Sequence, residues 1–239
     1  MTQPEEPKLP ELETAAKPVV VIETAIAASL ALAVLSLFLF AWIAEDVSHH
    51  RTMNFDLAVR GRIHAYANPA LTRAMFAVSF LGGDGLTIAA IVAEVIFLWR
   101  RWRRAALWLV TAVIGSVVLQ VTLKLAFHRP RPVPFFGSLP HTYSFPSGHA
   151  LSSFCFYGVL AGLLADRIRS PLLRILIWFS AAILVAAIGL SRIYLGVHYP
   201  SDVIAGYLTA ALWVSSMVTL DRLRVRRKEK TASLTVEDP

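Results

Sequence analysis

The stretch AIAASLALAVLSLFLFAWIA, from Ala25 to Ala44, contains no charged side chain. A helix needs about 20 apolar residues to cross the hydrocarbon core of a bilayer, and this stretch is long enough. Further apolar runs extend from Leu86 to Trp99, from Ala105 to Val121 and from Ile175 to Leu190. They are too long for core strands. We therefore predict an all-α, polytopic membrane helix bundle.

The overall composition agrees with a membrane protein. The 239 residues are 56% hydrophobic and 16% charged, whereas soluble domains are about 45–50% apolar and about 25% charged. The chain has room for roughly five to seven spans and for no separate soluble domain. A net charge of +7 would suggest nucleic acid in a soluble protein, but membrane proteins carry Lys and Arg on their cytoplasmic side. We expect membrane lipids, and no nucleic acid, as partners.

We predict six transmembrane helices within a membrane domain at 21–220, flanked by a disordered cytoplasmic tail at 1–20 and a basic cytoplasmic tail at 221–239. The expected spans are about 21–44, 86–99, 105–127, 148–165, 172–190 and 201–220. An even number of spans puts both termini on one side. Most of the 23 Lys and Arg residues then fall in the tails and inner loops. The positive-inside rule favours cytoplasmic termini.

The segment 45–83 is too long for a bare loop in a compact protein. Phe55, Val59, Ile63 and Tyr66 recur in it near helical spacing. We expect an extracytoplasmic, amphipathic helix lying in the membrane interface. Two roles are open for it: packing on the bundle, or guarding an entrance for lipids.

Three polar clusters mark the outer ends of the expected spans. They are Lys124 with Arg131-Pro132, then Pro146-Ser147-Gly148-His149, then Ser191-Arg192 with His198 and Asp202. Each has a structural alternative, since Ser147 can cap a helix, Asp202 can lie in a first helical turn and arginines can anchor a span at the interface. Their joint occurrence on one predicted face favours a single site.

Phosphate is the ligand that these residues suit. Lys124, Arg131 and Arg192 supply permanent positive charge, and the guanidinium fork matches phosphate oxygens. Ser147 and Gly148 open a span, where backbone N–H groups and the positive helix end favour an anion. No cluster of acidic residues and no His or Cys spacing typical of a metal site accompanies them. We therefore predict no metal and no cofactor.

Two histidines suggest a division of labour. A neutral imidazole attacks phosphorus, and a protonated one gives its proton to the leaving oxygen. Asp202, four residues after His198, can fix the tautomer of that ring and stabilise its cation. The sequence therefore predicts His198 as the nucleophile, His149 as the general acid, and Asp202 as the partner of His198.

The ordered motifs resemble those of the type 2 phosphatidic acid phosphatase (PAP2) superfamily of membrane lipid phosphatases. The family pattern of Lys, six residues, Arg-Pro is matched by Lys124 to Pro132; Pro-Ser-Gly-His is matched by Pro146 to His149; and Ser-Arg, five residues, His, three residues, Asp is matched by Ser191 to Asp202. The resemblance implies a helical core similar to that of vanadium haloperoxidases, and inhibition by vanadate. It also implies catalytic roles for His149, His198 and Asp202 and phosphate contacts from the remaining site residues, which are Lys124, Arg131, Ser147, Gly148 and Arg192.

Together these features predict an integral membrane enzyme that hydrolyses a lipid phosphomonoester or diphosphate through a phosphohistidine, without a metal. The expected substrates are polyprenyl diphosphate, phosphatidylglycerol phosphate and phosphatidate. The alternative is a lipid phosphotransferase that uses the same site with an alcohol acceptor. The short loops resemble bacterial members of the family, which predicts the bacterial inner membrane with the active site on its extracytoplasmic face.

Overall fold

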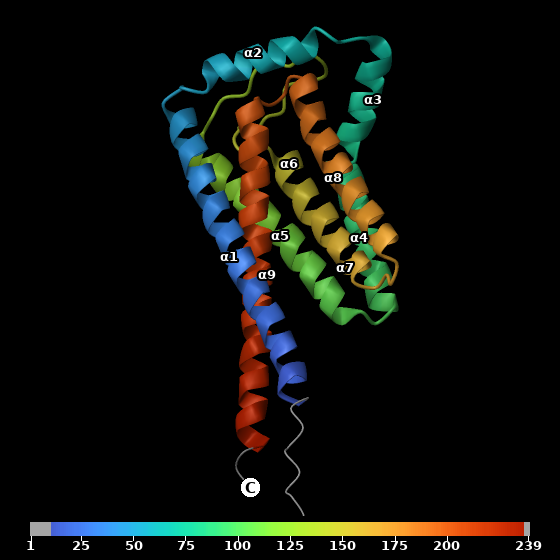
Figure 1. Ribbon diagram of the computed structural model, residues 1–239. Helices are drawn as coiled ribbons and strands as arrows, with labels where there is room; N and C mark the ends of the chain where they lie inside the picture. The colour runs from blue at the N-terminus through green and yellow to red at the C-terminus, as the bar shows by residue number, and fades with distance from the viewer. Residues whose placement is uncertain (1–10, 237–239) are drawn as a thin grey trace, which may run out of the picture. The chain divides into compact units, whose positions relative to one another are not determined.

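The computed structural model describes residues 11–236 as helices joined by turns and by one long loop at 128–147, with no strand in that range (Figure 1). Its elements are α1 (Glu11–Ser48), α2 (Met53–His64), α3 (Pro69–Phe80), α4 (Asp84–Trp99), α5 (Arg103–Phe127), α6 (Gly148–Ser153), a π-helical turn (Phe154–Gly158), α7 (Val159–Ala165), α8 (Pro171–Tyr194) and α9 (Pro200–Val236). The predicted all-α architecture is confirmed.

Six helical stretches of the described chain are long and apolar enough to cross a membrane. They are Ile22–Ser48, Pro69–Trp99, Arg103–Phe127, Gly148–Ala165, Pro171–Tyr194 and Pro200–Arg227. The number agrees with the prediction, but the second stretch begins earlier than Leu86, the residue expected from the sequence. The apolar helix α3, which we had assigned to the interfacial segment 45–83, joins α4 through the turn at 81–83. The glycine pair in that turn interrupts the apolar pattern.

Both ends of the described chain are more helical than predicted. Helix α1 begins at Glu11, inside the segment 1–20 that we predicted as a disordered tail; Glu, Leu, Ala and Lys favour helix, and a formed helix extends at low cost. Helix α9 continues through the basic segment to Val236. Residues 1–10 and 237–239, the outer parts of the two predicted tails, lie outside the described residues.

The chain divides into two compact units. One combines the chain up to Val34 with the chain from Ser215 onward. Within it, the hydroxyls of Ser29 and Thr219 lie 2.8 Å apart. The second unit, Leu35–Val214, holds every predicted site residue.

In the second unit, the span Gly148–Ala165 is central. It is 44% buried, against 11% for Pro171–Tyr194, and its first helix, α6, packs against α5 and α8. The π-helical turn interrupts this span, as is frequent at functional sites. Side chains on the outer spans are apolar and exposed, which suits a lipid environment.

Helix α2 lies at the end of the bundle where α8 ends and α9 begins (Figure 1). The predicted helix in this segment is present, but its buried residues are polar. Asp56 and Arg60 are 0% and 7% exposed, whereas Phe55 and Tyr66 are exposed. The spacing of the apolar residues did not indicate this polar inner face.

Candidate active site

The loop between α8 and α9 carries His198. Two residues earlier, Gly196 has a φ of +79°, and a Cβ at this position would stand 2.6 Å from the backbone N of Phe135. The N–H groups of Phe135 and Phe136 donate to the carbonyl of Leu195 at 3.0 and 3.2 Å. Glycine therefore allows the His198 loop to lie directly against the segment that follows α5.

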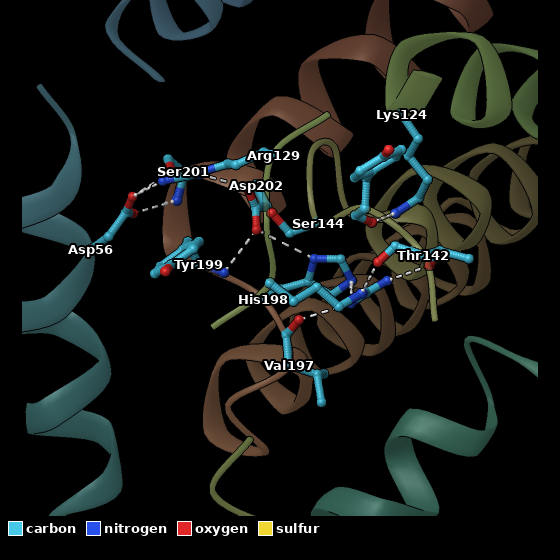
Figure 2. A network of polar contacts seen from close by, with 12 residues as sticks. Asp56, Lys124, Arg129, Thr142, Ser144, Val197, His198, Tyr199, Ser201 and Asp202 are labelled. Atoms are coloured by element: carbon cyan, nitrogen blue, oxygen red, sulfur yellow. Dashed lines mark hydrogen bonds and ion pairs between the residues drawn. The ribbon is translucent and has the colours of Figure 1, made fainter. Parts of the chain in front are cut away.

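His198 is 2% exposed and lies between two side chains of opposite charge. Its Nδ1 is 3.4 Å from Oδ2 of Asp202, and its Nε2 is 3.0 Å from Nη1 of Arg131. A guanidinium only donates hydrogen bonds, so Nε2 is the accepting nitrogen and Nδ1 carries the proton, facing Asp202. Figure 2 shows the contact between His198 and Asp202. The lone pair of Nε2 thus faces the guanidinium of Arg131, a group that suits phosphate.

Asp202 also has the structural role that its position suggested. It lies in the first turn of α9, which begins at Pro200, and its Oδ2 accepts the backbone N–H of Tyr199 at 2.9 Å. This is half of a capping box. The Asp202 side chain is completely buried, and its backbone carbonyl accepts the N–H of Ser147 at 2.9 Å. Asp202 therefore caps the start of α9, lies beside His198 and accepts a hydrogen bond from the residue that precedes α6.

Two of the predicted phosphate ligands hold the loop that precedes α6. Lys124, buried near the end of α5, donates to the carbonyl of Tyr143. Arg131 donates to the carbonyl and the hydroxyl of Thr142 at 2.6 and 2.9 Å, and to the carbonyl of Val197 at 2.8 Å. Both cations thus lie beside His198, one of them in direct contact with it.

Ser147 and Gly148 begin α6 at its approach to α5. Ser147 is completely buried, and its Oγ has no hydrogen-bond partner among the described residues. A Cβ at Gly148 would collide with the side chain of Gln120 on α5. A larger residue at 148 would therefore require the amide end of Gln120 to move away from the start of α6.

His149 and Arg192 lie on the α3–α4 side of the site. A Cβ at Gly83 would stand 3.1 Å from Nε2 of His149, so this ring packs against the turn between α3 and α4. Arg192 of α8 donates to the hydroxyl of Ser79 of α3. Its buried Nε has no hydrogen-bond partner within the described part of the chain, which leaves a donor available for a ligand.

The site is strongly positive. The positive charges of Arg192, Arg131 and Lys124 act on the His149 ring, which also interacts with His198. Burial, together with the charges of Arg131, Arg192 and Lys124, holds the pKa of His198 well below the ordinary value of 6.5. His198 is therefore a neutral imidazole at neutral pH, while the cations around it attract an anion. The structure thus brings the predicted residues together in one cluster.

Sequence reasoning missed a buried ionic network behind Asp202. Arg129 donates to Asp202 at 2.6 Å and to Asp56 of α2 at 2.8 Å. Ser201 contacts both Arg129 and Asp56. The one available signal was the i,i+4 spacing of Asp56 and Arg60, which puts them on the same helix face. The partners of that face are distant in sequence.

Among residues 11–236, no group of three or more His, Cys, Asp or Glu side chains is placed to hold a metal ion. The carboxylate beside His198 is Asp202, which is engaged by Arg129, and the cations around it are Lys and Arg, which have no lone pair to offer a metal. What the arrangement can do is bind an anion next to a neutral, oriented imidazole.

The comparisons with known proteins agree with this chemistry. Residues 105–226 match the PAP2 superfamily, and the chain belongs to this family. This range contains all eight predicted site residues. The chain is therefore a PAP2-type phosphatase and, with its six apolar helices, an integral multi-pass membrane protein.

Individual relatives cover much of the chain. Phosphatidylglycerophosphatase B of Bacillus subtilis is 31% identical over 181 residues, which are 72% of this chain and 86% of that protein. Undecaprenyl-diphosphatase of Sulfolobus acidocaldarius is 32% identical over 130 residues, 52% of this chain and 58% of that protein. The crystal structure of a transmembrane PAP2-type phosphatidylglycerolphosphate phosphatase from Bacillus subtilis has a TM-score of 0.72 at 24% identity and covers 81% of this chain and 96% of that one. The fold is therefore that of a PAP2 membrane phosphatase.

Proposed function

We propose that this protein removes a phosphate group from a lipid phosphate or lipid diphosphate through a phosphohistidine, without a divalent metal. The observation that carries the proposal is the position of His198, with Arg131 at its Nε2 and Asp202 beside its Nδ1. A neutral, oriented imidazole next to a guanidinium that suits phosphate is what phosphoryl transfer to histidine requires.

In the first step, the Nε2 lone pair of His198 attacks phosphorus. The bond from phosphorus to the leaving oxygen breaks, and that oxygen takes a proton from His149. As the N–P bond forms, the imidazole becomes positively charged, and Asp202 stabilises this charge while it holds the ring. His149 must enter this step protonated, a state that an anionic phosphate bound beside it favours.

In the second step, His149 acts as a base. It takes a proton from a water molecule, whose oxygen attacks the phosphorus of the phosphohistidine. The N–P bond breaks, and its electron pair returns to Nε2 of His198. Inorganic phosphate then leaves. Both histidines are then in their starting protonation states.

The positive charge that the transferring group needs comes from the protein. Lys124, Arg131 and Arg192 surround the phosphoryl oxygens, with the buried hydroxyl of Ser147 and the backbone at Gly148 as further donors. Three fixed cations compensate the charge that a divalent metal ion otherwise would, so chelators should leave the rate unchanged.

The substrate is a lipid because the site lies at the ends of apolar helices. A phosphate head on a tail that stays in the bilayer reaches such a site directly. Phosphatidylglycerol phosphate and polyprenyl diphosphate are the first candidates, in keeping with the names of the relatives, and phosphatidate is the third. The positive-inside rule puts both termini in the cytoplasm and the site on the extracytoplasmic face of the inner membrane of a bacterium.

The test is phosphate release from these three lipids by purified protein, with His198→Ala and a control. His141 lies in the same loop region and is exposed, so His141→Ala should keep the wild-type rate, while His198→Ala should abolish release. Labelled phosphate should remain on the wild-type protein after a rapid acid-free quench. Normal release by His198→Ala would refute the nucleophile, and loss of activity with EDTA that Mg²⁺ restores would refute the metal-free mechanism.

A further inference from the structure

The carboxylate of Asp56 in α2 is completely buried against the start of α9. It accepts the backbone N–H of Ser201 at 2.9 Å, the hydroxyl of Ser201 at 2.7 Å and Nη2 of Arg129 at 2.8 Å. Figure 2 shows these contacts from α2 to the residue next to Asp202. A buried carboxylate is costly unless it is paired and hydrogen-bonded, and this one is both.

Arg129 connects Asp56 to the site. Its Nη1 donates to Oδ1 of Asp202 at 2.6 Å, and its guanidinium carbon lies 4.2 Å from the ring centre of Tyr199. The other oxygen of Asp202 is the one that faces His198. Arg129 thus shares its charge between two carboxylates, one on α2 and one beside the nucleophile.

The charges of Asp56, Arg129 and Asp202 together set the net charge next to His198. Asp202 and Arg129 without Asp56 would form a neutral pair, in which the guanidinium cancels the charge that Asp202 offers to His198. With Asp56, two carboxylates share one guanidinium, and one net negative charge is left beside His198. That charge opposes the positive charge that develops on the imidazole when it is phosphorylated.

We propose that Asp56 is a positioning residue for catalysis: by pairing with Arg129 it keeps the negative charge of Asp202 available to His198. The inference rests on the proposed phosphohistidine mechanism. It also assigns a function to α2. From the sequence, two roles were open for this segment: packing on the bundle, or guarding an entrance for lipids.

A purely structural role for Asp56 makes different predictions. In that case Asp56 only fastens α2 to α9, and its loss lowers the folded fraction or weakens substrate binding. In the charge-based role, its loss slows the transfer of phosphate to His198 and leaves KM nearly unchanged, because the substrate-facing cations Lys124, Arg131 and Arg192 are untouched.

The experiment compares Asp56→Asn, Asp56→Glu, Arg129→Gln and the double variant Asp56→Asn/Arg129→Gln in detergent micelles with one lipid phosphate. Asp46→Asn is the matched control. It makes the same chemical change at an acid near the C-terminal end of α1, which pairs with the exposed Arg51. The readouts are kcat, KM, the single-turnover rate of labelling of His198, and the thermal midpoint.

We expect Asp56→Asn to lower kcat and the labelling rate on the order of 10- to 50-fold, the effect of one unit charge at an effective dielectric constant of about 20, with KM within about twofold. Asp56→Glu, which keeps the charge, should recover at least half of the lost rate. The double variant again has one net negative charge beside His198, as in wild type, so it should be faster than Asp56→Asn, in which that charge is zero. Asp46→Asn should behave as wild type.

A double variant no faster than Asp56→Asn would overturn the proposal, and so would a wild-type kcat in Asp56→Asn. If Asp56→Asn does not fold, the double variant decides the question: with one net negative charge it should label His198 at close to the wild-type rate, and a loss of about 10-fold or more would overturn the proposal. Failure of the phosphohistidine mechanism is separate: it would appear as the absence of labelling in wild type, whatever Asp56 does.

Discussion

Arg131 points a guanidinium nitrogen at Nε2 of His198 from 3.0 Å, although the two residues are 67 positions apart in the chain. The contact shows which nitrogen holds the lone pair, and it puts the strongest phosphate-binding type of side chain next to the attacking atom. A phosphate group that enters this space meets the donor and the nucleophile together.

Replacement of Arg131 by Lys should therefore harm the chemical step as well as binding. Lysine keeps the charge but lacks the planar fork that also holds Thr142 and Val197. We expect kcat/KM to fall by about 100-fold, the typical loss for one transition-state donor. Steady-state kinetics check this. Arg62→Lys, an exposed change on α2, is the control and should leave both constants unchanged.

Asp202→Asn should lower kcat by at least about 100-fold, because a neutral amide stabilises the imidazolium poorly. The amide oxygen still accepts the N–H of Tyr199, so the start of α9 is kept. Kinetics and the thermal midpoint should be measured on the same preparation. A folded variant with normal kcat would contradict the role of Asp202.

The pH dependence of stability should reflect the buried neutral imidazole. The pKa of His198 is held well below 6.5 in the folded protein, so below about pH 6.5 the unfolded chain binds a proton that the folded chain does not. Stability should fall with decreasing pH, by at most about 1.4 kcal/mol per pH unit from this group. Thermal midpoints from pH 8 to 5 test this. In His198→Gln the decline should be smaller; an equal decline would assign it to other groups.

Activity should have a bell-shaped pH profile, since one histidine must be neutral and the other protonated. The lowered pKa of His198 means that the nucleophile remains competent below pH 6.5, so the acid limb of kcat/KM should lie under that value. Rates on a lipid phosphate across pH 4–9 provide the measurement. A rate that rises steadily with pH through the histidine range would be inconsistent with the mechanism.

Gly148→Ala should reduce activity, because the new methyl group would displace the side chain of Gln120 against the start of α6. Adding Gln120→Ala should restore part of the loss by removing the colliding atoms. Gly61→Ala is the matched control: it has open space around its Cβ position and should leave activity unchanged and raise stability by up to about 1 kcal/mol. No recovery in the double variant would place the cause elsewhere.

The sequence by itself determined the membrane helices and the order of the chemical motifs. Apolar runs such as 25–44 depend only on local composition, and the spacing of His198 and Asp202 is one helical turn. The start of the second span, by contrast, was predicted at residue 86 and lies at Pro69. The prediction was wrong because a glycine turn divides this stretch into two separate apolar runs.

The tertiary structure alone decided which charges meet. Asp56 and Ser201 are 145 residues apart, and the contact of Arg129 with both carboxylates follows no local period. Such contacts depend on how helices pack, and packing is fixed by the fit of side chains over the whole bundle. Local patterns in the sequence therefore supplied the chemistry of the site, while the fold set the balance of charge around His198.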